Sequence, residues 1–327
     1  MRRNLIPSLL AILASSAFSG GTSVVYAADP VAKSTPAAVA GIDATLPESA
    51  ILLPAKVLRG NDFKAFFQTL PSEDRTKAEN DWKETQAKAK SGTPKDLSQV
   101  NEMLAKLLAP DAVEAMFKET EPKLADIKPD EIAQQMQMGA AFIPMMFSQP
   151  SPGQTPEQTK NKQMLGAMLS GIMTDASTWV PTAGLNDPKK LRSAIEHLVA
   201  GAKSLGVKNI EELQALPFEE FLGRVGPLVK EAKAAAGVYD VQVDAFLDSI
   251  KAVPAAAPAA AAPEDKSLTM TCTIFGKPYS IPVLVTKKDG HWVVSPKNGE
   301  AFGAMQKMMG GGGAPAGGGP EEMPPMK

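Results

Sequence analysis

Residues 268–275 read LTMTCTIF, and at this point the spacing of apolar residues along the chain changes. Apolar side chains occupy every second position, at Leu268, Met270, Cys272 and Ile274, and threonines fill the positions between them. This alternation predicts a half-buried β-strand. Upstream, apolar residues recur instead at helical spacing over residues 44–251. The sequence therefore predicts a long helical region followed by a small sheet.

Two further strands are predicted after this one. The segments YSIPVLVT (279–286) and HWVV (291–294) are rich in β-branched residues, and Asp289-Gly290 between them is a strong hairpin-turn pattern. Pro282 predicts a bulge or a free edge in the second strand, because proline has no amide hydrogen to donate. A sheet this small is marginally stable alone, so we expect it to dock on the helices.

The helical region carries repeated start and stop patterns. Asp187-Pro188 predicts a helix start, because aspartate caps free amides and proline favours the first helical position. Gly206 predicts the end of that helix. Asn61 predicts another cap, and Gly226-Pro227 predicts an interruption of the helical stretch 209–236. The predicted fold class is α+β and mainly α: a multi-helix domain with a small C-terminal three-stranded antiparallel meander.

The chain divides into six predicted segments, which differ in composition and periodicity. They are a signal peptide (1–27), a flexible leader (28–43), a helical domain (44–251), an Ala/Pro linker (252–266), a β-meander with a short terminal helix (267–309) and a disordered Gly/Pro/Met-rich tail (310–327).

The first residues have the three parts of a secretory signal peptide. Arg2 and Arg3 give a positive start, an apolar run follows from Leu5 to Phe18, and small residues place the predicted cleavage after Ala27. The arginine pair also fits a twin-arginine export signal, although its place at the extreme start of the chain favours the ordinary secretory route. The apolar run is shorter than the roughly 20 residues that span a bilayer, so we expect no stable membrane anchor after cleavage. The predicted location is the periplasm of a Gram-negative host.

The net charge limits the possible partners, and the cysteine content limits the possible sources of stability. Cleavage removes two arginines and no acid, so the net charge changes from −2 to about −4. Mild acidity with interspersed charges provides no basic patch, so no nucleic-acid partner is predicted. Cys272 is the single cysteine, which excludes an internal disulfide and leaves stability to the core.

Residues 136–147, MQMGAAFIPMMF, contain four methionines and no charge. No charged residue occurs from Ile132 to Pro156, or from Gln163 to Thr174. Separated by a turn-rich connector at 148–157, these stretches predict two helices in an antiparallel hairpin. Pro144 predicts a kink or an end in the first of them, because it removes a hydrogen bond to the preceding turn.

Three interpretations of the methionine-rich segment compete. Packing core is favoured, because methionine fills irregular gaps between helices and apolar stripes are usually packed. An adaptable groove would bind a partner protein or an apolar ligand. Soft thioethers would bind Cu(I), although no histidine lies nearby in the sequence. If the segment is exposed, the predicted contact surface comprises Met136, Met138, Phe142, Met145 and Met146.

No catalytic residue, metal ligand or cofactor is predicted. The chain lacks the serine-hydrolase, zinc-protease, Cys-x-x-Cys and phosphate-loop motifs. We expect His197 at the surface or boundary of an amphipathic helix, and His291 as a polar residue at the edge of a turn. Cys272 is expected to be a buried structural thiol. Carboxylates are plentiful, but no pair stands out from solvated helix faces.

The segment VLVTKKDGHWVV (283–294) resembles the closing hairpin of exported NTF2-like domains, where strand, Asp-Gly, Trp and strand recur. The resemblance is confined to this hairpin and implies a non-catalytic binding or accessory module. The curved sheet of that family has more strands than this chain predicts, and the long helical region departs from it. As a whole the chain resembles a bacterial exported protein.

The predicted function is therefore that of an exported, periplasmic, non-enzymatic interaction or accessory protein, whose partner is a protein or an apolar ligand. Two alternatives stay open. One is a periplasmic Cu(I)-handling protein that uses its Met clusters, and the other is a hydrolase-like enzyme that uses carboxylates.

Overall fold

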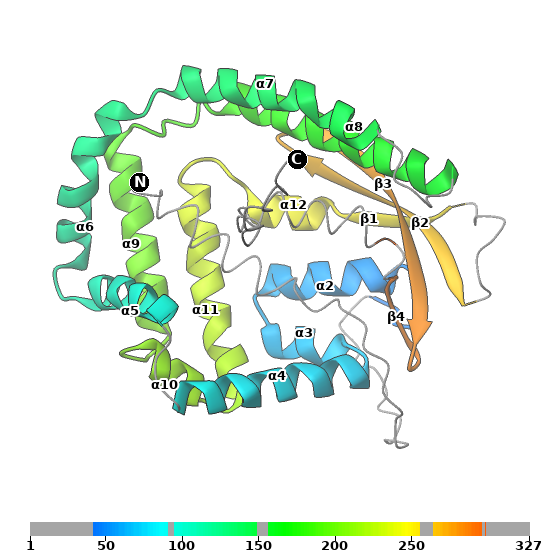
Figure 1. The fold of residues 1–327 in the computed structure, drawn as a ribbon, viewed down its shortest axis with the longest axis horizontal. Coiled ribbons are helices and arrows are strands. Elements are labelled where there is room, and N and C mark those ends of the chain that lie inside the picture. Colours follow the sequence, from blue (N-terminus) through cyan, green and yellow to red (C-terminus); the bar gives the residue numbers. More distant parts are fainter. Residues whose placement is uncertain (1–41, 91–94, 149–155, 256–263, 296–297, 299–327) are drawn as a thin grey trace, which may run out of the picture. The chain divides into compact units, whose positions relative to one another are not determined.

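The computed structural model describes residues 42–90, 95–148, 156–255, 264–295 and 298. Within them the chain is mainly helical, with a small antiparallel sheet near its C-terminal end, which confirms the predicted fold class (Figure 1). The helical elements are α2 (Ser49–Gly60), α3 (Phe63–Thr69), α4 (Ser72–Lys90), α5 (Lys95–Leu108), α6 (Ala112–Thr120), the 3-10 helix η1 (Glu121–Asp126), α7 (Pro129–Ser148), α8 (Pro156–Trp179), α9 (Pro188–Ser204), α10 (Ile210–Ala215), α11 (Phe218–Gly237) and α12 (Val243–Ser249). The predicted signal peptide, the tail 310–327 and the terminal helix before it lie outside the described residues, as do most of the predicted leader and linker.

The sheet has four strands in the order β1-β2-β3-β4, so the predicted count of three is wrong. The strands are β1 (Lys251–Pro254), β2 (Asp265–Ile274), β3 (Lys277–Lys288) and β4 (His291–Val294). β1 occupies the start of the predicted linker, and its Lys251 pairs with Thr271 of β2. Because β1 is a short and largely exposed edge strand, its four residues show no buried alternation from which to predict it.

Two tight turns set the register of the sheet. Phe275-Gly276 joins β2 to β3, Asp289-Gly290 joins β3 to β4, and all four residues have positive φ, as type I′ hairpin turns require. Pro282 pairs with Thr269 of β2, while β4 pairs only with the segment of β3 from Val285 onward. Pro282 therefore lies at a free edge, as predicted.

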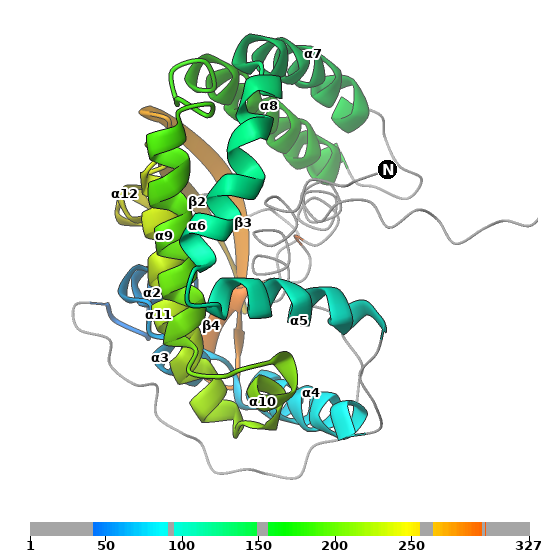
Figure 2. The same ribbon diagram turned by 90° about the vertical axis from the view of Figure 1, so that its left-hand side faces the viewer.

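A buried apolar cluster forms around α9, a helix that lies beside α6 in Figure 2. The side chain of Asp187 accepts a hydrogen bond from the Lys189 amide, Pro188 opens the helix, and Gly206 follows its last turn at φ +64°. This confirms the predicted start and stop. The buried cluster joins α9 to α5, α6 and η1, and it comprises Leu104, Leu107, Ala112, Leu124, Leu191, Ile195, Val199, Ala202, Leu205 and Val207.

Helix α11 runs without a break through Gly226-Pro227, so the interruption predicted there is wrong. The chain turns earlier, at Pro217, between α10 and α11. Gly226 instead permits a close approach, because a Cβ atom there would lie 2.4 Å from the backbone oxygen of Asn61. Asn61 has φ +57° and ends α2, while the neighbouring Asp62 caps α3 by accepting from the Ala65 amide. The cap is therefore one residue later than predicted.

The sheet docks on the helices, as predicted. Leu268, Val283 and Val285 are almost completely buried, and the sheet contacts α2, α8 and α12. Polar links add to this packing. Among them, the indole of Trp292 donates to the Thr45 oxygen at 2.9 Å, and the Lys288 ammonium lies 2.8 Å from a carboxylate oxygen of Glu73.

Helices α7 and α8 form the predicted antiparallel hairpin, and Figure 1 shows them alongside one another. The Ser170 hydroxyl donates to the Ala140 oxygen at 2.8 Å, and the Phe147 ring lies against Gly166. Helix α7 does not end at Pro144. Proline cannot donate to the carbonyl four residues earlier, which is that of Ala140, and the Ser170 hydroxyl supplies this bond instead. No helix in the described segments has the length and hydropathy that a bilayer crossing requires.

Candidate functional site

An exposed apolar surface runs along α7. Met138, Phe142, Met145 and Met146 are 53%, 60%, 63% and 58% exposed. Their spacing of three, four and seven residues places them along one side of the helix. We call these four residues the α7 face. Met136, the fifth predicted contact residue, is half-buried and lies seven residues before the buried Ile143, on the packed side.

The opposite side of α7 is the one that packs on α8. Ala140, Ile143 and Phe147 are each only 3% exposed, and a Cβ atom at Gly166 of α8 would come within 2.5 Å of the Phe147 Cβ. Gly166 thus lets the two helices approach closely. The interpretation of the segment as packing core is correct for this side and wrong for the α7 face.

The chemistry of the α7 face is uniform. Three thioethers and one phenyl ring project from it, and α7 carries no charged residue after Glu131. Unbranched methionine side chains change rotamer at little cost and fit partners of varied shape. The surface is therefore suited to apolar contact rather than to proton transfer or anion binding.

A polar cluster joins α8 to β3. The buried carboxylate of Asp175 accepts hydrogen bonds from the ammonium of Lys277 and the hydroxyl of Tyr279. The cluster borders an open hollow of about 530 Å³, which Ser170, Gly171 and Thr174 also line. A carboxylate beside a phenol and an ammonium is a candidate set of acid–base groups.

The protonation of this cluster argues against acid–base catalysis. Burial by itself raises the pKa of Asp175, but the hydrogen bonds from Lys277 and Tyr279, with the charge of Lys277, lower that pKa on balance below its usual range. Burial, and then the bond to Asp175, raise the pKa of Tyr279 well above its usual range. Both groups therefore keep one protonation state near neutral pH, whereas a general acid or base works best when its pKa is near the operating pH. The cluster fastens the sheet to the α7–α8 hairpin.

The structural role of the Asp175 carboxylate predicts how the stability of the fold depends on pH. Because the pKa of Asp175 is lower in the folded chain than in the unfolded chain, its ionised form stabilises the fold above pH ~4, and this contribution is lost as the pH falls through the folded pKa. We expect Asp175→Asn to lower the free energy of unfolding by about 1–2 kcal/mol at pH 7. The difference between the two proteins should shrink as the pH falls below ~4 and should be smallest below the folded pKa, where the carboxyl of the folded wild type is also neutral. Urea unfolding of both proteins from pH 7 to pH 2 measures it, and a difference that does not change with pH would contradict the assignment.

His197 and Cys272 lie in the environments that the sequence predicts for them. The Nδ1 atom of His197, on α9, lies 2.8 Å from a carboxylate oxygen of Glu231 on α11, at the boundary between core and solvent. Cys272 is buried in β2, and burial raises the pKa of its thiol. A thiol of raised pKa is a poor nucleophile, which agrees with a structural role.

His291 opens β4 directly after the Asp289-Gly290 turn, at the edge of a turn as expected. The sequence did not predict its burial: only 6% of its surface is exposed, because α2 packs against β4. The hairpin pattern locates the turn but carries no information on which distant helix covers it. A histidine this deeply buried is a functional candidate that sequence reasoning missed.

Among the described residues, no three His, Cys, Asp or Glu side chains come together as potential metal ligands. The likeness of the β3–β4 hairpin to NTF2-like domains stays a prediction. No protein-family model, no curated protein and no solved structure matches the chain.

Proposed function

We propose that the protein is an exported, non-enzymatic interaction or accessory protein, and that the α7 face is its contact surface. The exposure of Met138, Phe142, Met145 and Met146 carries this proposal. All four belong to a helix whose opposite side is packed on α8. Loose packing of the α7–α8 hairpin therefore does not explain their exposure. Contiguous exposed apolar side chains mark binding surfaces in soluble proteins.

The partner that fits this surface is an apolar segment of another protein. A phenyl ring flanked by flexible thioethers suits an amphipathic helix or an extended apolar strand. A lipid surface fits less well, because membrane-surface helices carry lysine and arginine on their polar face, whereas the charged residues of α7 are the acids Asp130 and Glu131.

Export is the second part of the proposal. It rests on the signal-peptide pattern of residues 1–27, with cleavage after Ala27. The intact mass of the protein recovered from a periplasmic extract tests it. The expected mass is that of a chain beginning at Ala28, and a chain that retains Met1 would contradict cleavage.

Two matched variants test the contact surface. In the first, glutamine replaces Met138, Phe142, Met145 and Met146. In the second, leucine replaces the three methionines, which preserves apolar area and removes sulfur. Both should keep the free energy of unfolding within about 0.5 kcal/mol per substitution, because exposed positions contribute little to stability.

The binding measurement is recovery of cross-linked partners with tagged protein from the producing cells, identified by mass spectrometry. We expect the glutamine variant to lose the partner and the leucine variant to retain it. Equal recovery with wild type and the glutamine variant would contradict the proposal.

Copper handling is the second candidate, favoured by the exposure of three thioethers along one side of α7. The same leucine variant separates it from partner binding. If Cu(I) titration shows binding by the wild type that the leucine variant loses, the methionines act as ligands. If neither protein binds Cu(I), this candidate fails and the contact surface is unaffected.

A further inference from the structure

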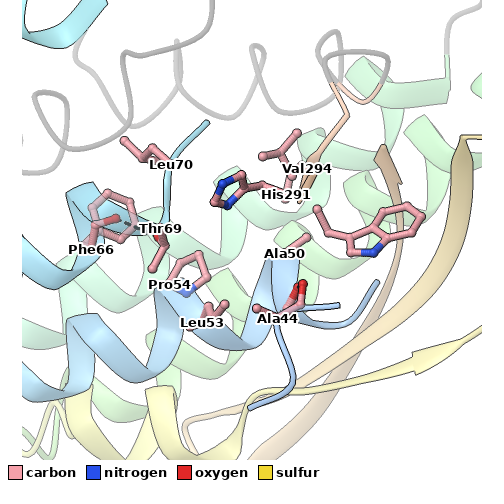
Figure 3. Close-up of a pocket in the computed structure, with 12 residues that line it drawn as sticks. Ala44, Ala50, Leu53, Pro54, Phe66, Thr69, Leu70, His291 and Val294 are labelled. Atoms are coloured by element: carbon pink, nitrogen blue, oxygen red, sulfur yellow. Dashed lines mark hydrogen bonds between the residues drawn. The ribbon is translucent and has the colours of Figure 1, made fainter. Parts of the chain in front are cut away.

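A small apolar cavity lies between β4 and the helices α2 and α3. Its volume is about 170 Å³, and its walls include Ala50, Leu53 and Pro54 of α2 and Phe66 of α3. In Figure 3 the imidazole of His291 extends from β4 toward this space, between Thr69 on one side and Ala50 on the other. Aliphatic and aromatic side chains thus surround one buried polar ring.

The other polar groups at this cavity already have partners. The Ser49 hydroxyl donates to the Ala44 oxygen at 3.3 Å, and the Thr69 hydroxyl donates to the Phe66 oxygen at 2.7 Å. The indole of Trp292 donates to the Thr45 oxygen. In contrast to these three groups, the imidazole of His291 makes no hydrogen bond or ion pair within the described chain.

A neutral imidazole has one donor and one acceptor nitrogen, and the polar groups of largely buried side chains usually have a hydrogen-bond partner. The residue His291 is more than nine-tenths buried, but its ring nitrogens are not among the completely enclosed atoms that lack a partner in the described chain, so they remain accessible. Because the ring faces the cavity, a partner reaches these nitrogens from the cavity side. We propose that this cavity binds a small neutral molecule with an apolar body and one hydroxyl group, and that the hydroxyl hydrogen-bonds to His291.

The volume sets the size of the ligand. Cavities of ~150 Å³ lined by apolar side chains bind molecules the size of benzene, whereas drug-sized ligands occupy roughly 300–1,000 Å³. The walls set its polarity, because an isolated charge in an apolar cavity is strongly disfavoured. A hydroxyl both donates and accepts, so it pairs with either nitrogen of a neutral imidazole. Phenol has these properties and serves as the probe.

The site is independent of the α7 face. It is built from α2, α3 and β4, and none of its lining residues belongs to α7 or α8. Loss of partner binding by the α7 variants therefore says nothing about this cavity, and the reverse also holds.

The test is titration of the full mature chain with phenol and, separately, with benzene, followed by the indole N–H resonances in ¹H–¹⁵N spectra. The chain has three tryptophans, and Trp292 alone lines the cavity, so Trp82 and Trp179 are internal controls. We expect phenol to shift the Trp292 resonance with a Kd of about 1 mM or lower, and to bind about 10-fold more tightly than benzene. Absence of a Trp292 shift up to saturating phenol would overturn the proposal, and so would equal affinities for phenol and benzene.

Two variants locate the interaction. His291→Leu should weaken phenol binding about 10-fold while changing benzene affinity by less than about twofold, because one hydrogen bond is lost and the apolar walls remain. Ala50→Leu should weaken both ligands, because it fills part of the cavity. If His291→Leu does not fold, the preference of the wild type for phenol over benzene and the effect of Ala50→Leu still test the proposed site. Unchanged phenol affinity in Ala50→Leu would place binding elsewhere and overturn the site.

Discussion

Phe147→Ala should lower the free energy of unfolding by about 3–5 kcal/mol, whereas Phe142→Ala should change it by less than about 0.5 kcal/mol. Both residues are phenylalanines of α7, but Phe147 is 3% exposed against α8 and Phe142 is 60% exposed. Truncating Phe147 removes buried apolar area and leaves a cavity beside Gly166, while truncating Phe142 removes area that water already reaches.

Chemical denaturation of the two variants and the wild type measures this difference. The comparison is well matched, because helix, residue type and substitution are the same. If Phe142→Ala destabilised the protein as strongly as Phe147→Ala, the α7 face would be packed in solution and unavailable to a partner. The proposed contact surface would then fail with it.

Gly226→Ala should lower the free energy of unfolding by about 3 kcal/mol. A Cβ atom at this position would lie 2.4 Å from the backbone oxygen of Asn61, and backbone at the end of α2 cannot move aside as a flexible side chain would. Helix α11 must therefore shift relative to α2, which disturbs packing along both helices.

Gly237→Ala provides the control on the same helix. A Cβ atom there meets nothing within 4 Å, so we expect a gain of about 0.5 kcal/mol from the reduced entropy of the unfolded chain. Thermal and urea unfolding of both variants give the two values. Destabilisation by Gly237→Ala of the same size would show that α11 rejects alanine generally, and that the contact with Asn61 is not the cause.

Local patterns predicted much of the fold. Asp187-Pro188 and Gly206 bound α9 because capping and positive φ are decided by residues adjacent in sequence. Asp289-Gly290 gave the hairpin for the same reason. β1 was missed because it becomes a strand only through pairing with β2, and its own residues are mostly exposed. Gly226-Pro227 was misread because the reason for the glycine is the backbone of Asn61, far away in sequence.

The candidate sites were less accessible to sequence reasoning. In α7 both sides of the helix are uncharged, so apolar periodicity could not separate the packed side from the exposed one. The continuation of α7 past Pro144 depends on the Ser170 hydroxyl of a different helix. Burial of His291 likewise depends on α2, which precedes it by more than two hundred positions. Each of these features arises from tertiary contacts that no local pattern encodes.

Site-specific photo-crosslinking from position 142 shows whether the α7 face contacts another protein in the cell. A benzophenone side chain replaces Phe142 in the producing cell, and a control protein carries it at Glu119 of α6, which is also exposed. We expect a discrete adduct with one partner protein from position 142. This adduct should be absent from position 119 and should be lost when Met138 and Met145 are changed to glutamine. No adduct at position 142 above the level at position 119 would contradict the proposed contact surface.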